Sequence, residues 1–191
     1  MLRRSLVLLV AGAAIAAVAA TASSAGRTGS GLARPLHLPR VAWDAPCPVS
    51  RVDRRVPFVR RFGVSPGIGS GPAYPVGLPD GVLRLAPARN FHSRRWAGQK
   101  VLWFVLPSYR GPLLIRGARV DGPGRVRFEQ GAVPPKQLWI RAGETQGETG
   151  SPVPNGTRYL PSYTRLRGPG CYAYQIDGAT FSRVVVFRAT R

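Results

Sequence analysis

The chain has 191 residues, the length of one ordinary domain, and its 23 glycines and 19 prolines recur throughout. Such frequent helix breakers exclude coiled coils and helix bundles, which need long uninterrupted runs of helix-forming residues. The 28 basic residues against 8 acidic ones give a formal charge of +20, which predicts a strongly positive surface.

The first 25 residues have the layout of a secretory signal peptide. Arg3 and Arg4 precede the apolar run Ser5–Ala20, and small residues suited to cleavage follow it. We therefore predict a signal peptide over residues 1–25, removed on export, and a secreted or cell-envelope location. The alternative is an uncleaved N-terminal membrane anchor, because the apolar run is just long enough to cross a thin bilayer.

Export changes the interpretation of the two cysteines, Cys47 and Cys171. In an oxidising compartment an isolated pair predicts a disulfide, with two free buried thiols as the alternative. Closing so long a loop contributes about 4–5 kcal/mol in the chain-entropy model. No metal site is predicted, because the cysteines and histidines lack the spacing of zinc ligand pairs, and no motif calls for a cofactor.

Residues 26–40 are rich in Gly, Ser and Arg without periodicity, which predicts a flexible spacer before a single domain over 41–191. In that domain short apolar runs alternate with turn residues. The predicted strands are 56–59, 82–85, 101–106, 112–120, 125–128, 137–141, 157–159, 171–176 and 180–188. Runs this short predict an all-β, antiparallel sandwich or barrel, with less than about a tenth of the mature chain in helix. The last two are expected to form a hairpin across a type I′ turn at Asp177-Gly178.

The final third of the chain carries a resemblance to a known group of proteins. Residues 168–178 read GPGCYAYQIDG and are followed by Phe181-Ser182 and Val184–Phe187. This arrangement resembles the closing hairpin of uncharacterised exported proteins of high-GC bacteria. Further matches lie upstream, at 100–103, 109–112, 117–122, 126–128 and 161–164. The resemblance covers about residues 43–188 and implies an immunoglobulin-like β-sandwich without implying an activity.

The sequence contains no convincing catalytic constellation, so we do not expect an enzyme. Residues 63–67 fit the G-x-S-x-G pattern, but Pro66 lacks the N–H that the oxyanion hole needs. His92, in a polar loop, is the best isolated acid–base candidate, and no pair of carboxylates is seen to converge. Turn chemistry accounts for the three aspartates that precede glycine, which are Asp80, Asp121 and Asp177.

The aromatic residues fall into two groups. Those in predicted strands are expected in the core, and they are Trp103, Phe104, Trp139, Phe181 and Phe187. Those in looser contexts either cover the core or line a ligand surface, and they are Trp43, Trp96, Tyr109 and Tyr163.

With few acids available for pairing, most arginine side chains are expected on the surface, dispersed along the solvent faces of strands. Adjacent pairs are the candidate polyanion contacts, namely Arg54, Arg55, Arg60, Arg61, Arg94 and Arg95. No recognition helix or signature aromatic sheet is present to read a nucleic-acid sequence. The charge therefore predicts weak, non-specific binding to anionic polymers. The alternative is that genome composition supplies the arginines and the charge only maintains solubility.

These features together predict a secreted, non-catalytic β-sandwich module that acts as a binding or structural protein of the cell envelope. Its expected partners are anionic envelope polymers or other polyanions. An extracellular nucleic-acid or general polyanion binder is the alternative function. An enzyme of unspecified class, which would need His92 to cluster with carboxylates in a cleft, is the third, and the oligomeric state is left open.

Overall fold

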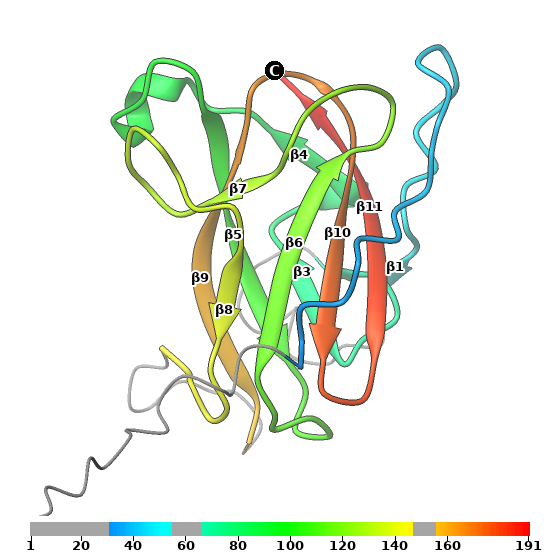
Figure 1. Ribbon diagram of the computed structural model, residues 1–191, viewed down its shortest axis with the longest axis vertical. Helices are drawn as coiled ribbons and strands as arrows, with labels where there is room; N and C mark the ends of the chain where they lie inside the picture. Colours follow the sequence, from blue (N-terminus) through cyan, green and yellow to red (C-terminus); the bar gives the residue numbers. More distant parts are fainter. Residues whose placement is uncertain (1–30, 55–65, 147–155) are drawn as a thin grey trace, which may run out of the picture.

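The computed structural model describes residues 31–54, 66–146 and 156–191, which form a five-stranded sheet, a four-stranded sheet, a separate two-stranded pair and two short 3-10 turns (Figure 1). The predicted all-β class, almost without helix, is confirmed for this part of the chain. The signal segment 1–25 and the predicted strand 56–59 lie outside the described residues.

The larger sheet has five strands in the order β4-β11-β10-β6-β8. Their bounds are β4 Val82–Arg84, β6 Leu113–Arg119, β8 Leu138–Ile140, β10 Gly170–Gly178 and β11 Ser182–Thr190. All neighbours are antiparallel except β4 and β11, which pair in parallel. The expected antiparallel arrangement therefore holds for every pair in this sheet but one.

The smaller sheet has four antiparallel strands in the order β3-β5-β9-β7. Their bounds are β3 Ala73–Val76, β5 Ala97–Val105, β7 Arg127–Phe128 and β9 Arg158–Leu166. A separate pair consists of β1 Val52–Asp53 and β2 Gly67–Ile68, and the 3-10 turns are η1 Pro79–Gly81 and η2 Ala88–Phe91.

The two sheets share one apolar core. In β5, Val101, Trp103 and Val105 belong to this core, whereas Phe104 belongs to a smaller cluster with Tyr74 and Val76 of β3. Four residues of the run VLWFVL are buried, and Leu102 and Leu106 are partly buried, so its continuous apolar composition corresponds to a strand covered on both faces but more completely on the core face.

Tyr174 of β10 lies at the centre of the main core. Its ring centroid is 5.2 Å from that of Trp103 and 4.4 Å from that of Phe187. A hydrogen bond of 2.7 Å between the Tyr174 and Thr164 hydroxyls joins β10 to β9 and therefore joins the two sheets. Burial raises the pKa of the Tyr174 phenol well above its usual value, although the Thr164 bond opposes the shift.

The predicted hairpin between β10 and β11 is present, but its turn lies two residues later than expected. Asp177 still pairs with Ser182, and the Gly178 amide donates to the Phe181 carbonyl at 2.9 Å. Gly178 has no positive φ, so the predicted type I′ turn at Asp177-Gly178 is wrong. Asp177 instead stays within the strand, where its buried side chain accepts hydrogen bonds.

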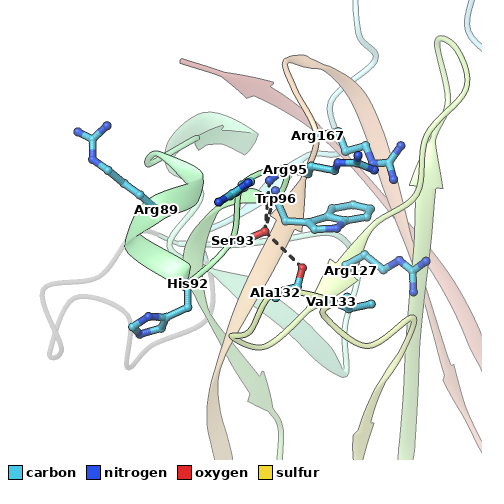
Figure 2. Close-up of a pocket in the computed structure, with 10 residues that line it drawn as sticks. Arg89, His92, Ser93, Arg95, Trp96, Arg127, Ala132, Val133 and Arg167 are labelled. Carbon is cyan, nitrogen blue, oxygen red and sulfur yellow. Dashed lines mark hydrogen bonds between the residues drawn. The ribbon is translucent and has the colours of Figure 1, made fainter.

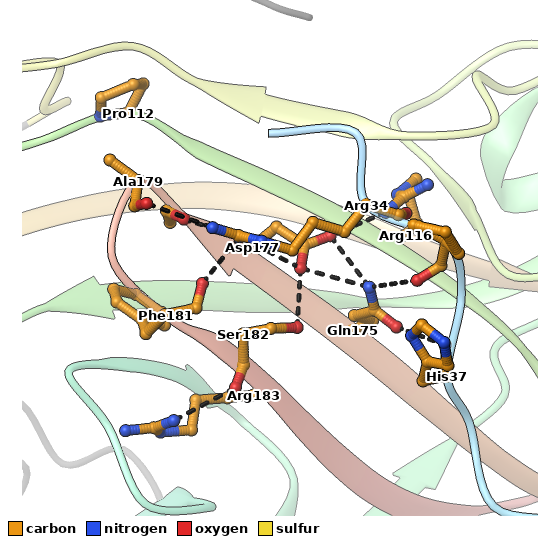
Figure 3. A network of polar contacts seen from close by, with 12 residues as sticks. Arg34, His37, Pro112, Arg116, Gln175, Asp177, Ala179, Phe181, Ser182 and Arg183 are labelled. Carbon is orange, nitrogen blue, oxygen red and sulfur yellow. Dashed lines mark hydrogen bonds and ion pairs between the residues drawn. The ribbon is translucent and has the colours of Figure 1, made fainter. Parts of the chain in front are cut away.

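Asp177 lies in a polar network on the outer face of the larger sheet (Figure 3). Its carboxylate accepts from Arg116 and from Ser182, each at 2.7 Å, and from the Gln175 amide at 3.1 Å. Arg34 approaches the same carboxylate at 3.7 Å. These contacts explain Asp177 better than turn chemistry does.

The same network fixes the N-terminal segment to the sheet. Arg34 donates to the carbonyls of Gly178 and Phe181, and the His37 amide donates to Gln175 at 2.7 Å. Residues 31–40 are therefore held along the sheet, contrary to the flexible spacer expected over 26–40; residues 26–30 lie outside the described part. The composition of residues 26–40 does not indicate this attachment, because the polar side chains that hold the segment come from β10.

Further along, the N-terminal segment reaches the disulfide. The sulfur atoms of Cys47 and Cys171 are 1.96 Å apart and their Cα atoms 5.4 Å apart, which agrees with the predicted pairing. Beside them, Asp121 accepts from the Cys171 amide at 2.9 Å and from Arg119 at 2.5 Å. Burial by itself would raise the pKa of Asp121, but these hydrogen bonds and the Arg119 charge lower it overall.

Candidate anion-binding site

Three strands bring separate segments together at the end of the smaller sheet where β5 begins and β9 ends (Figure 1). Trp96 precedes β5, whose first residue pairs with the last residue of β9, and Arg167 follows β9. Arg127 of β7 pairs with Arg165 of β9. This register places residues that are up to 78 positions apart around one hollow.

The hollow has a volume of about 700 Å³, and we name it the Arg–Trp96 pocket (Figure 2). It is lined by Arg89, His92, Ser93, Arg94, Arg95, Trp96, Arg127, Ala132, Val133 and Arg167.

Ser93 shapes the loop that carries two of these arginines. Its Oγ accepts from the amides of Arg95 and Trp96, at 3.3 and 3.2 Å, and donates to the Ala132 carbonyl at 3.4 Å. The hydroxyl thus closes a local turn, as serine side chains commonly do, and ties it to the loop after β7.

Trp96 forms the inner wall of the pocket and is only 8% exposed. The guanidinium carbons of Arg127 and Arg167 lie 5.4 and 4.8 Å from the centre of its ring, within cation–π range. In Figure 2 the indole lies between these two arginines. Trp96 was open to two interpretations in the sequence, and its burial favours covering the core.

Arg165 does not line the pocket but contacts residues around it, and its side chain is fully buried. Its guanidinium donates twice to the Trp96 carbonyl, at 3.1 and 2.5 Å, and once to the Glu129 carbonyl at 3.0 Å. It also lies 4.4 Å from the centre of the Phe91 ring in η2. One side chain therefore joins three of the segments that surround the hollow, and burial lowers the pKa of its guanidinium.

The charged side chains in the described lining of the pocket are positive and not balanced by acidic ones. Five arginines line it, four of them exposed, and the lining as described includes no Asp or Glu. Guanidinium groups gathered without acidic partners attract anions and offer them paired N–H donors.

The isolated acid–base candidate lies at the edge of this pocket. His92 is exposed at the end of η2, and in Figure 2 its ring points away from Trp96. Its neighbours in the described lining are arginines and not the carboxylate that an acid–base pair would need. Nor does any group of three or more potential metal ligands occur among the residues that the structure describes.

Of the arginines predicted from the sequence, the structure brings two into the pocket. Arg94 and Arg95 line it, whereas Arg54 is exposed beside a separate hollow that also contains Asp53. The other three candidates, Arg55, Arg60 and Arg61, lie outside the described residues, as does Ser65 of the G-x-S-x-G pattern.

Three lining arginines, Arg89, Arg127 and Arg167, were not singled out from the sequence. They come from three separate segments, and no adjacent pairing marks them. The expectation of a dispersed surface coat is also wrong for two buried arginines, Arg158 and Arg165. Arg158 donates to the carbonyls of Arg141 and Gly111, both at 2.8 Å, so neutral backbone acceptors replace the missing acids.

The aromatic expectations hold in part. Trp103, Phe104 and Phe187 are fully buried, but Trp139 is 37% exposed because it alternates with the inward Ile140 on the edge strand β8. Trp43 is 85% exposed on a loop of the N-terminal segment.

Comparison with known families, curated proteins and solved structures finds no match to this chain. In the described part of the chain no helix is both long and apolar enough to cross a membrane.

Proposed function

We propose that this protein is an exported, non-catalytic immunoglobulin-like β-sandwich that binds anionic polymers of the cell envelope through the Arg–Trp96 pocket. The observation that carries the proposal is the gathering of five arginines around one hollow without an acid in its described lining. Cys47 and Cys171 at disulfide distance support an oxidising compartment outside the cytoplasm. Two sheets over a common core support the sandwich architecture.

The pocket favours recognition of charge over recognition of shape or sequence. Its arginines are mostly exposed, and no α-helix or broad aromatic surface accompanies them in the described structure. Binding should therefore release counterions from the polymer and weaken steeply between about 50 and about 200 mM salt. A nucleic acid is one possible polyanion, but we expect no preference among its sequences.

The test compares two variants that lose the same charge. The pocket variant replaces Arg89, Arg94 and Arg95 with Gln, and the control replaces Arg110, Arg141 and Arg183, which are also exposed but lie outside the pocket. Retention on heparin, duplex DNA and an anionic envelope polymer is measured across a salt series. We expect the pocket variant to lower the salt slope by about two to three units and the control by less than about one.

Equal losses in the two variants would contradict the proposal, because they would show that charge acts as a dispersed coat. Retention that does not respond to salt would contradict it as well. Absence of retention even at low salt would also contradict the proposal. It would mean that the many arginines reflect the composition of the chain and not a binding function.

A further inference from the structure

The indole in the Arg–Trp96 pocket is unsuited to stacking on a ligand. Trp96 is 8% exposed, and Arg127 and Arg167 lie against its ring. The described lining contains no Phe, no Tyr and no second Trp. Binding modules for sugars or single-stranded nucleic acids use exposed aromatic faces, so this pocket must hold its ligand by another means.

The indole instead lies within cation–π range of two guanidinium groups, 5.4 and 4.8 Å from its ring centre. A guanidinium that packs its face on a ring keeps its N–H edge available, and that edge matches two oxygens of a phosphate. Arg127 Nε is buried and has no hydrogen-bond partner among the described residues, while Nη1 of the same side chain makes only a 3.5 Å contact with the Pro134 carbonyl. The long Nη1 contact leaves Arg127 with donor capacity that its neighbours in the described structure do not use.

The number of cations indicates how much negative charge the ligand carries. One phosphate bears about two charges at neutral pH, whereas five arginines surround the hollow. We infer that the Arg–Trp96 pocket is a binding site for closely spaced phosphate groups, such as those of a polyphosphate or phosphodiester chain. This inference rests on the proposed function and specifies its ligand.

The first experiment separates phosphate from negative charge in general. Isothermal titration calorimetry measures the affinity of the full disulfide-bonded protein for three anions at one ionic strength. The anions are inorganic tripolyphosphate, orthophosphate and butanetetracarboxylate. We expect tripolyphosphate to bind at least about tenfold more tightly than either competitor, because only it offers several bidentate acceptors within the hollow. Equal affinity for the tetracarboxylate would overturn the inference.

The second experiment separates the guanidinium edge from its charge. Arg167→Lys retains the charge but loses the planar fork, and Arg183→Lys is the matched control because Arg183 lies 5.7 Å from the centre of the Phe181 ring. Both side chains are exposed, so both variants should keep the melting temperature of the wild type. We expect Arg167→Lys to lose about fivefold or more in affinity for tripolyphosphate, and Arg183→Lys to lose none.

The outcomes separate the two proposals. If Arg167→Lys binds tripolyphosphate as the wild type does, while the triple pocket variant loses retention on polymers, the phosphate inference fails and the proposed function stands. If the triple pocket variant binds every polyanion as the wild type does, both fail.

Closely spaced phosphates occur both on soluble chains and at a phospholipid surface. Val133, on the rim of the pocket, is 85% exposed and is the side chain that a bilayer would contact. Co-sedimentation with phosphatidylglycerol vesicles that is weakened by Val133→Ser, with no change in tripolyphosphate affinity, would assign a lipid source. Tight tripolyphosphate binding without vesicle binding would assign a soluble chain, and weak binding to both probes would overturn the inference.

Discussion

Replacing Arg165 with Ala should lower the free energy of unfolding by about 3–5 kcal/mol and should also abolish polyanion binding by the pocket. The side chain is fully buried, and its removal leaves the carbonyls of Trp96 and Glu129 without their donors. Each buried acceptor left unpaired costs about 1–3 kcal/mol, and the space vacated beside Phe91 adds a cavity. Urea denaturation measures the loss.

Two further variants divide this effect into its parts. Arg165→Met restores most of the volume but none of the hydrogen bonds, so it should recover only the cavity contribution. Arg167→Ala, two residues away and exposed, should change stability by no more than about 1 kcal/mol while it weakens anion binding. If Arg165→Ala has the same free energy of unfolding as the wild type, the hydrogen bonds of Arg165 do not stabilise the segments around the pocket.

Removing the disulfide should have the other large effect, a loss of about 4 kcal/mol in the free energy of unfolding. Cys47 and Cys171 are 124 positions apart, so the bond restricts a very long loop in the unfolded chain. It also holds the N-terminal segment against a cluster that contains Val120 and Val186 on the outer face of the larger sheet. The comparison is between the wild type and a variant with both cysteines replaced by Ala.

Mass spectrometry before and after reduction provides the check on the bond itself. Reduction should add two hydrogens to the mass of the native protein, and the unreduced protein should resist alkylation. Two alkylatable thiols in the unreduced protein, or a double variant as stable as the wild type, would contradict a stabilising disulfide.

Strand positions were predictable from the sequence where side-chain pattern and turn chemistry agree. The β-branched run in β11 and the continuous apolar run in β5 mark their strands directly. By contrast, β3 contains Pro75 and follows several glycines, so it looks like a loop. It forms because it is an edge strand of the smaller sheet, where a missing backbone N–H can face away from its neighbour.

For a related reason the sequence predicts only residues 157–159 where β9 spans Arg158–Leu166. Pro161 and the polar residues around it interrupt the apolar pattern, yet the strand runs the full length of β5. Its other neighbour in the sheet that the structure describes, β7, pairs near residues 164 and 165, so the proline does not break a ladder on that side.

The candidate site was only partly predictable because its residues meet through long-range pairing. Arg94-Arg95 is visible as an adjacent basic pair, but nothing local places Arg127 and Arg167 against Trp96. Their meeting depends on the register between β7 and β9, which is set by the core and by the closing turns. The net charge of the chain indicates that the protein attracts anions. Only the fold shows where on its surface they would bind.

An NMR titration that follows the indole N–H signals of the protein's four tryptophans tests directly whether anions bind in the Arg–Trp96 pocket. Assignment uses single Trp→Phe variants, and heparin oligosaccharide or tripolyphosphate is the added anion. Because Arg127 and Arg167 lie against the Trp96 ring, anion binding in the Arg–Trp96 pocket should cause a large, saturable shift of the Trp96 signal. The signals of Trp43, Trp103 and Trp139 should stay in place. A Trp96 signal that does not move while the protein is saturated with anion would contradict binding at the Arg–Trp96 pocket.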